Sequence, residues 1–315
     1  MNRQLRIPIG WDVSNIPDQS GRRILITGGN SGLGLATAQA LTRRGALVTI
    51  TSRDPERGEW ARRQIGHGAE VIPLDLTDLE KIHATANEIN RAGNIFDVVV
   101  LNAGIMATPL RLTRDGFESQ MATNHLGHFA FAGLIKGVIG ERLITVSSQA
   151  HRIGSFGNGS REDIRDRCTG VGRYAPWAAY GASKLANLLF TAELERRRLQ
   201  NNWEFIPLAA HPGWASTNLF QSGGREASLQ DRISHLATRV IAQSSAQGAL
   251  PTLCAATFPG LLGSSYLGPD GLGQMWGKPQ LTRARPLAYD QTLGANLWAV
   301  SEELTGVTWE NSAHA

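Results

Sequence analysis

Tyr180 and Lys184 stand four residues apart in an Ala- and Leu-rich run with helical periodicity. Residues at positions i and i+4 of a helix project from one face, about one turn apart. A free tyrosine has a pKa of ~10 and does little acid–base work at neutral pH, but a neighbouring ammonium favours the phenolate and lowers that pKa. The pair therefore suits general acid–base chemistry. The same spacing also arises as surface decoration, so the surrounding sequence must decide between the two interpretations.

A glycine-rich loop near the N-terminus is a second candidate for chemistry. It joins an apolar run at 24–26 to an Ala-rich helical run that ends near Arg44, and a β-branched run at 47–50 completes a β-α-β unit. Glycines at such a turn let the backbone approach a pyrophosphate, which then lies at the helix N-terminus. This context favours nucleotide binding over a plain tight turn. The predicted phosphate-binding residues are Thr27, Gly28, Asn30, Ser31, Gly32, Leu33 and Gly34.

The residues after the second predicted strand indicate which nucleotide binds. A site for NAD places an acidic residue there, against the ribose hydroxyls. Asp54 is the nearby acid, but Pro55 follows it, and Asp at the N-cap with Pro at N1 is a helix start. Ser52 and Arg53 are then left at the ribose, where a guanidinium suits a 2′-phosphate. NADP(H) is therefore the favoured cofactor, and NAD(H) is the alternative.

Polar and small residues also follow the later strands of the predicted sheet, at the edge where parallel sheets bind ligands. Asp75 and Leu76 follow the third strand, although Asp75 can instead cap the next helix. Asn102-Ala103-Gly104 follows the fourth strand. Ser147-Ser148 follows the fifth strand, and these serines are either site residues or turn formers. Asn124 lies in a helical run, where a mediocre helix former indicates either a kink or a satisfied core amide.

Short apolar runs alternate with helical runs along the chain, a pattern that predicts an α/β fold with one Rossmann-type, doubly wound parallel sheet and helices on both faces. We expect one NAD(P)-binding domain over residues 1–315, because no repeat or low-complexity linker divides it. The later strands are expected near 70–74, 96–101, 142–146, 205–209 and 265–267. The later helices are expected near 55–65, 79–91, 114–138, 178–199, 229–241, 246–256 and 289–304, with a kink at Pro251.

Composition excludes several classes of protein. The 315 residues are 42% hydrophobic and 18% charged, as in a soluble globular protein. The net charge of +4 is spread thinly, which argues against nucleic-acid binding. Cys168 and Cys254 are far apart, and the histidines do not cluster with acids, so we expect no disulfide framework, no metal site and a cytoplasmic location. No apolar run approaches the ~20 residues of a membrane span.

These residues together resemble the short-chain dehydrogenases/reductases from about Arg22 to Gly213. The motifs occur in that family's order: Thr27-Gly28-x-x-x-Gly32-x-Gly34, Asn102-Ala103-Gly104, Asn124, Ser148, Tyr180-x-x-x-Lys184 and Pro212-Gly213. The resemblance implies that Tyr180 is the general acid/base and that Lys184 lowers its pKa while binding the nicotinamide ribose. It further implies that Ser148 hydrogen-bonds the substrate oxygen, that Asn124 holds a relay water, and that Pro212, Gly213 and Thr217 lie near the nicotinamide.

Two stretches depart from the common family pattern. Ser148 and Tyr180 are 32 positions apart, and the intervening insertion at about 151–179 looks like the subgroup of retinol dehydrogenases and protochlorophyllide reductases. His151 fits that subgroup, whose members tend toward bulky apolar substrates. The second departure is a long tail after the last strand, which either covers the sheet edge or extends the terminal helix packing. Residues at about 214–243 are expected to form a substrate lid.

The resulting hypothesis is an NADP(H)-dependent oxidoreductase that interconverts an alcohol and an aldehyde or ketone on an apolar substrate. The alternative is an NADP(H)-binding sensor or scaffold protein without turnover. A sugar-nucleotide epimerase is disfavoured by the spacing of the glycine loop, and a hydrolase by the lack of a Gly-x-Ser-x-Gly motif. The resemblance also suggests a homo-dimer or homo-tetramer that forms through the helices near 114–138 and 178–199, unless the insertion blocks it.

Overall fold

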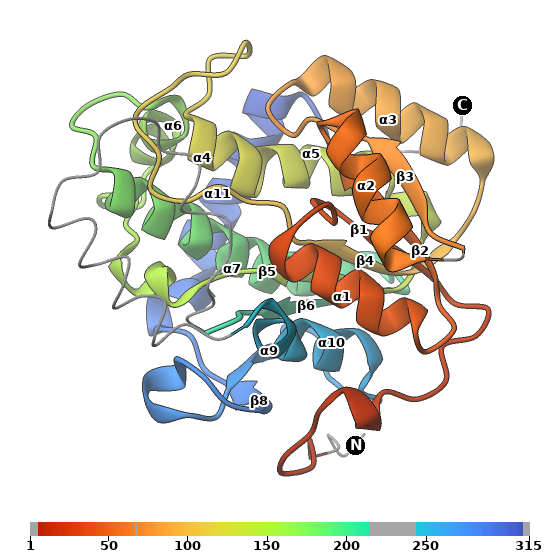
Figure 1. Cartoon of the computed structure of the whole chain (residues 1–315). Helices are drawn as coiled ribbons and strands as arrows, with labels where there is room; N and C mark the ends of the chain where they lie inside the picture. Colours follow the sequence, from red (N-terminus) through yellow and green to blue (C-terminus); the bar gives the residue numbers. More distant parts are fainter. Residues whose placement is uncertain (1–5, 67, 214–243, 311–315) are drawn as a thin grey trace, which may run out of the picture.

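A single sheet of eight strands organises the computed structural model, which describes residues 6–66, 68–213 and 244–310. The strand order is β3-β2-β1-β4-β5-β6-β7-β8 (Figure 1), and every neighbouring pair is parallel except the antiparallel pair β7–β8. The strands are β1 Arg23–Ile26, β2 Leu47–Ser52, β3 Glu70–Pro73, β4 Phe96–Leu101, β5 Ile139–Val146, β6 Ile206–Ala210, β7 Tyr266–Pro269 and β8 Pro279–Thr282. This architecture confirms the predicted α/β fold class.

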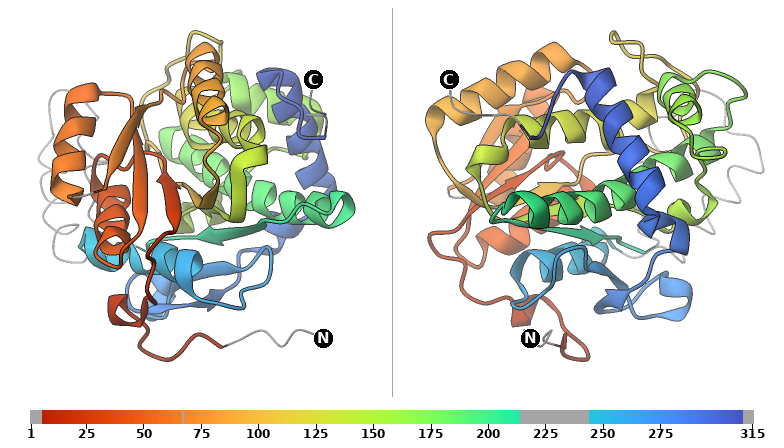
Figure 2. Two further views of the ribbon diagram at one scale, coloured as in Figure 1. Left: turned by 90° about the vertical axis from the view of Figure 1, so that its right-hand side faces the viewer. Right: turned by 180° about the vertical axis from the view of Figure 1, so that it is seen from behind.

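Helices cover both faces of the sheet (Figure 2). Alternate residues of β1 show why: Ile24 and Ile26 join a core with α1, α2 and α10, whereas Leu25 joins a core with α3, α5, α7 and α11. A strand that is buried on both faces needs a continuous apolar sequence. The α-helices are α1 Gly32–Thr42, α2 Pro55–Ile65, α3 Leu79–Ala92, α4 Ser119–Met121, α5 Gly127–Leu134, α6 Arg161–Thr169, α7 Pro176–Asn201, α9 Ser245–Gly248, α10 Leu250–Thr257 and α11 Gln291–Thr305.

The continuous helix predicted over 114–138 is wrong. Its first residues form a turn at Gly116, which has a φ of +83°, and α4 begins only where the Glu118 carboxylate accepts hydrogen bonds from the backbone N–H groups of Gln120 and Met121. A π-helical segment, η2 (Ala122–Leu126), separates α4 from α5 and contains Asn124, which confirms the irregularity predicted there. The helix ends at Leu134, and a 3₁₀ turn, η3 (Lys136–Val138), leads into β5.

The C-terminal third also differs from expectation. The helix predicted near 246–256 is divided into α9 and α10, with Pro251 in the first turn of α10 as its fixed φ requires. Strand β8 (Pro279–Thr282) and the short helices η6 (Leu272–Gln274) and η7 (Pro286–Tyr289) were not predicted, nor was η4 (Gln149–Ile153) earlier in the chain, because such short elements carry little periodicity. The helix predicted near 229–241 and the lid predicted at about 214–243 lie outside the described residues.

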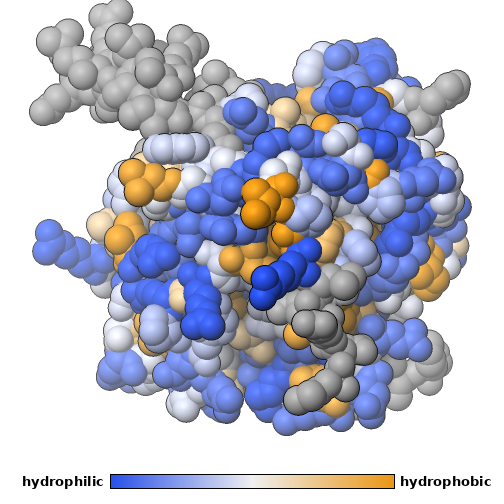
Figure 3. Space-filling model, turned by 90° about the horizontal axis from the view of Figure 1, so that it is seen from below, coloured by the Kyte–Doolittle hydropathy of each residue, from blue (hydrophilic) through white to orange (hydrophobic). Residues whose placement is uncertain are grey.

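The segment before β1 packs beneath the sheet. Trp11 and Ile16 are buried in the core beside α1, and Asp12, which caps the 3₁₀ turn η1 (Val13–Asn15), pairs with Lys278 at 3.0 Å. Figure 3 shows this side of the molecule as largely hydrophilic, with separate apolar patches. The tail after β7 is therefore tied to the N-terminal segment as well as to the sheet.

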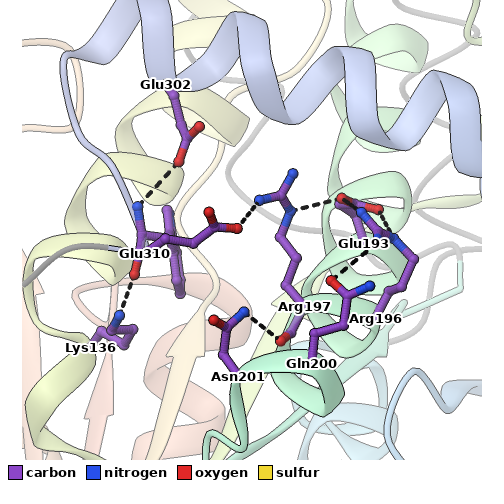
Figure 4. A network of polar contacts seen from close by, with 9 residues as sticks. Lys136, Glu193, Arg196, Arg197, Gln200, Asn201, Glu302 and Glu310 are labelled. Carbon is purple, nitrogen blue, oxygen red and sulfur yellow. Dashed lines mark hydrogen bonds and ion pairs between the residues drawn. The ribbon is translucent and has the colours of Figure 1, made fainter.

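Helix α11 and the residues that follow it cover α5 and α7. Trp309 is fully buried against Phe129, Phe190 and Trp298. Figure 4 shows the polar contacts around this segment: the Lys136 ammonium donates to the Trp309 carbonyl, and the Arg197 guanidinium bridges Glu193 and Glu310. An oligomer through α5 and α7 would have to use the parts of these helices that this segment leaves uncovered.

Candidate functional site

The glycine loop after β1 is shaped for close approach by a ligand. Gly28 has a φ of +64°, and a Cβ added there would lie 2.9 Å from Ala103. A Cβ at Gly34 would lie 2.5 Å from the side-chain nitrogen of Asn102. The side chain of Ser31, the N-cap of α1, makes no capping hydrogen bond, so the N–H groups of the first turn are left for another acceptor. The residues therefore fit a pyrophosphate at the N-terminus of α1.

Thr27 and Asn102 join the ends of β1 and β4. The Thr27 hydroxyl oxygen accepts hydrogen bonds from the backbone N–H groups of Asn102 at 2.9 Å and Ala103 at 3.0 Å. The Asn102 side chain in turn donates to the Thr27 carbonyl at 2.9 Å. These two predicted site residues thus fix the loops of the central strands to each other, so part of their role is structural.

Asp54, which follows β2, caps the next helix as the sequence predicted. The Asp54 carboxylate caps α2 by accepting from the backbone N–H of Arg57 at 3.1 Å, and the buried Ser52 hydroxyl donates to the Asp54 carbonyl at 2.7 Å. The Arg53 side chain remains exposed at this edge. The acid is therefore engaged by the helix, which leaves the guanidinium as the charged group free to meet a ligand among these residues.

Asp75 lies beyond β3 but does not cap α3, whose N-cap is Asp78. Its carboxylate accepts from the backbone N–H of Thr77 at 3.1 Å and from the Thr77 hydroxyl at 2.6 Å, which forms an Asx turn. Burial raises the pKa of this carboxyl, but the Thr77 hydrogen bonds and the charges of Lys81 and Arg53 together bring it below its ordinary value. Asp75 is therefore a negative charge at the edge, and the neighbouring Leu76 is buried.

Tyr180 and Lys184 lie one turn apart on α7, and both are buried, with exposed fractions of 6% and 5%. The Lys184 ammonium lies 5.8 Å from the centroid of the Tyr180 ring and donates to the Val146 carbonyl at 3.0 Å. Burial lowers the pKa of Lys184 to about 8. The surface-decoration interpretation is therefore wrong, since the pair faces the end of β5.

The expected depression of the Tyr180 pKa is not found in this structure. Burial raises the pKa of Tyr180 to about 12, and only a hydrogen bond from the Ser148 side chain opposes the rise. The physical reason is that desolvation of the phenolate outweighs the attraction of an ammonium that points to the Val146 carbonyl. Tyr180 is consequently a protonated acid at neutral pH, placed beside Ser148.

Asn124 lies in η2 with its side chain satisfied, as the core-amide alternative predicted. Its carbonyl oxygen accepts from the backbone N–H of Ile105 at 2.9 Å, and its amide nitrogen donates to the Ile105 carbonyl and the Ser183 hydroxyl, each at 2.9 Å. A Cβ at Gly104 would lie 3.1 Å from Asn124 and 3.5 Å from the Lys184 ammonium. Asn124 and Lys184 are thus brought together around Gly104.

His128 is a site residue that the sequence analysis missed. Its Nδ1–H donates to the Asn124 carbonyl at 3.2 Å, and its Nε2 accepts from the Thr27 hydroxyl at 2.8 Å. Burial lowers the pKa of His128 to about 3, so the ring is neutral. The sequence signal for its role is its spacing of four residues from Asn124.

The ends of β5 and β6 complete the edge. Ser148 caps η4 by accepting from the backbone N–H of Ala150 at 3.2 Å, and the Ser147 hydroxyl donates to the Lys184 carbonyl at 2.8 Å. The backbone N–H of Gly213, which has a φ of +73°, donates to Nδ1 of His211 at 3.2 Å. Pro212 and Gly213 therefore lie on the same edge, whereas Thr217 lies outside the described residues.

Comparisons with known proteins establish the family. A family model described as short chain dehydrogenase matches residues 22–160. Retinol dehydrogenase 14 of Homo sapiens is 33% identical over 91% of this chain and 87% of its own, and short-chain dehydrogenase TIC 32 A, chloroplastic, of Brassica napus is 31% identical over 93% and 91%. A crystal structure of an uncharacterized protein from Mycobacterium paratuberculosis is 40% identical, covers 95% of this chain and 99% of its own, and superposes with a TM-score of 0.80.

The chain therefore belongs to the short-chain dehydrogenase family, and it is an oxidoreductase that acts on CH–OH groups with NAD(H) or NADP(H). The similarity to a retinol dehydrogenase confirms the predicted subgroup. Within the part of the chain that the structure describes, no helix is long and apolar enough to span a membrane. The described residues likewise include no group of three or more His, Cys, Asp or Glu side chains placed to hold a metal ion.

Proposed function

We propose that this protein is an NADP(H)-dependent oxidoreductase that interconverts an alcohol and an aldehyde or ketone on an apolar substrate, with Tyr180 as the general acid/base. The observation that carries the proposal is the burial of Tyr180 and Lys184 together beside Ser148, at the ligand edge of the sheet. A tyrosine and a lysine on the surface would stay solvated and keep their ordinary pKa values. Titratable groups that are buried and have shifted pKa values at the ligand edge of a sheet indicate a functional site.

The proton chemistry follows from the two pKa shifts. In the reduction direction Tyr180 is protonated, because burial raises its pKa to about 12, and its O–H donates to the substrate oxygen while Ser148 hydrogen-bonds that oxygen. The tyrosinate that forms is stabilised by the Lys184 ammonium, which is mostly protonated at neutral pH because its pKa is about 8. In the oxidation direction the Tyr180 phenolate, stabilised by the Lys184 ammonium, would accept the proton of the substrate hydroxyl. A bound nicotinamide supplies or accepts the hydride.

The cofactor would be held along the edge described above. Arg53 would pair with the 2′-phosphate of NADP(H), and Ser52 would hydrogen-bond beside it. Lys184 would bind the nicotinamide ribose, and Asn124, which lies beside Gly104 and Lys184, would hold a water of the proton relay. His128 would support Asn124 through its hydrogen bond to the Asn124 carbonyl. The remaining proposed cofactor residues are Thr27, Gly28, Asn30, Ser31, Gly32, Leu33, Gly34, Asp75, Leu76, Asn102, Ala103, Gly104, Tyr180, Pro212, Gly213 and Thr217.

An apolar substrate is supported by the surroundings of Tyr180. Trp177 lies in the first turn of the same helix, is 47% exposed and meets the Tyr180 ring edge-on at a centroid distance of 6.0 Å. A large apolar side chain left open beside the reacting group, as Trp177 is, suits an apolar ligand, and one relative of this chain is named for retinol. Cys168 and Cys254 are free and buried, which fits the proposed cytoplasmic location.

The test is turnover of NADPH against a panel of aldehydes and ketones, in which long apolar members are compared with short polar ones. We expect NADPH oxidation with the apolar members and formation of the matching alcohol. Tight NADPH binding without turnover of any carbonyl or alcohol would support the sensor or scaffold alternative instead.

A further inference from the structure

Helix η4 begins at the proposed substrate-binding residue, Ser148, and packs against α7, the helix that carries the proposed acid, Tyr180. Ser148 is its N-cap, and Gly154 follows its last residue. A Cβ at Gly154 would lie 2.2 Å from the Gly181 carbonyl, and one at Gly181 would lie 2.8 Å from the Ala150 carbonyl. The backbones of η4 and α7 are therefore in direct contact at the residue after Tyr180, so the place of η4 determines how Ser148 lies relative to Tyr180.

The side chain of His151, which lies within η4, hydrogen-bonds the backbone of Ser148. Its Nδ1–H donates to the Ser148 carbonyl at 2.7 Å, and the backbone N–H of Arg285 donates to its Nε2 at 3.4 Å. The ring is fully buried and meets Tyr266 edge-on. Burial is the main reason that the pKa of His151 falls to about 4, which keeps the ring neutral with its proton on Nδ1.

The tail after β8 holds the other end of η4. The Arg285 guanidinium donates to the Arg152 carbonyl at 2.7 Å and to the Gly154 carbonyl at 2.6 Å, which are orphan acceptors at the end of the helix. The planar guanidinium of arginine has several N–H donors in a fixed geometry, so one side chain can bind both carbonyl groups at once.

A second contact from the tail reaches the first residue of η4. The Gln149 side chain donates to the Gln274 side-chain oxygen at 2.6 Å, and His211 donates to the same oxygen at 3.1 Å. Gln274 has a φ of +58° and follows Gly273, whose φ is +60°. A non-glycine residue persists in the left-handed region only when its surroundings hold it there, and the contacts of the Gln274 side chain with Gln149 and His211 are part of those surroundings.

We propose that His151 and Arg285 are positioning residues that hold η4 between α7 and the C-terminal tail, so that the Ser148 hydroxyl lies against the Tyr180 hydroxyl. The inference deepens the proposed function and rests on it. It assigns the tail after β7, whose role the sequence left open, to the alignment of the substrate oxygen. Neither residue touches substrate; both act through Ser148.

The test compares His151→Phe and Arg285→Ala with the wild-type enzyme. We expect kcat for carbonyl reduction to fall about 10- to 100-fold in each, as a displaced reacting group requires. NADPH binding, measured by fluorescence, should stay within about twofold, because the substituted residues lie in η4 and the C-terminal tail and not in the glycine loop. His151→Asn should restore most of kcat, since its side-chain amide can donate in place of Nδ1. Arg283→Ala, an exposed neighbour in the same tail, is the matched control.

A double-mutant cycle separates positioning from general destabilisation. In a Ser148→Ala background the further effect of Arg285→Ala on kcat should nearly vanish, because there is no hydroxyl left to position. Losses that multiply in full would overturn the inference, as would unchanged kcat in Arg285→Ala.

A readout without turnover covers the case of an inactive or unstable variant. Hydrogen–deuterium exchange of the wild-type and Arg285→Ala proteins should show faster exchange at residues 149–154 and unchanged exchange at 22–44. Equal exchange at 149–154 would overturn the inference even if no substrate is found. Wild-type activity that does not depend on Ser148 would instead contradict the proposed function.

Discussion

At the scale of single residues, the site is governed by desolvation. Tyr180 and Lys184 are forced toward their neutral forms, the tyrosine by a raised pKa and the lysine by a lowered one. Each shift follows from the cost of burying the charged form. The proposed acid is therefore fully protonated, and the ammonium beside it is the group that titrates near neutral pH.

The pH dependence of reduction follows from these directions. Tyr180 stays protonated across the accessible range, so we expect kcat/KM for carbonyl reduction to be level near pH 7 and to fall as the pH rises through the Lys184 pKa of about 8. Loss of the ammonium removes the charge that stabilises the tyrosinate. A pH–rate profile measures this, and Lys184→Met should lack the alkaline limb. The same limb in Lys184→Met would assign it to another group.

The proposed preference for NADP(H) depends on Arg53. Arg53→Ala should weaken NADP binding by about 10- to 100-fold, which corresponds to ~1.5–3 kcal/mol for a hydrogen bond to a charged group, and should leave NAD binding nearly unchanged. Arg57→Ala, also exposed on the first turn of α2, is the matched control. Isothermal titration with both cofactors makes the comparison, and an equal loss for the two would contradict the NADP preference.

At the scale of elements, close backbone contacts position the site. The contact between η4 and α7 depends on Gly154, because an added Cβ would lie 2.2 Å from the Gly181 carbonyl. Gly154→Ala should therefore lower the free energy of unfolding by about 1–3 kcal/mol, as overpacking does, and should also lower kcat. Urea denaturation measures the first effect.

Gly137→Ala is the matched control, since nothing lies within 4 Å of its added Cβ. Full stability and full activity of Gly154→Ala would show that η4 and α7 can separate without consequence.

The sequence predicted the elements that carry strong patterns. The β-α-β unit around the glycine loop, the cap at Asp54 and helix α7 all follow from local periodicity and capping chemistry. An irregularity at Asn124 was one of the alternatives that the sequence left open, but its π-helical form and strand β8 were not predicted, because a π segment and a short antiparallel edge strand depend on tertiary contacts. Likewise, the residue types predicted that Tyr180 and Lys184 act together, but the sign of the Tyr180 pKa shift depends on burial, which only the fold determines.

At the scale of the whole molecule, the C-terminal residues complete the core. Trp309 is fully buried among Phe129, Phe190 and Trp298. Trp309→Ala should lower the free energy of unfolding by about 3–5 kcal/mol, because it removes a large buried side chain. Trp60→Ala, with 48% exposure, is the control and should cost little. Chemical denaturation checks both, and similar stability of the two variants would contradict the assigned role of this segment.

The central claim is that Tyr180 exchanges the proton with the substrate oxygen, and single-turnover NADPH oxidation by Tyr180→Phe tests it most directly. We expect NADPH to bind with near wild-type affinity and the rate of the chemical step to fall by about 10²- to 10⁴-fold, the contribution of a positioned general acid. Tyr289→Phe, at an exposed tyrosine, should react at the wild-type rate. A Tyr180→Phe enzyme that reduces its carbonyl substrate at the wild-type rate would contradict the account.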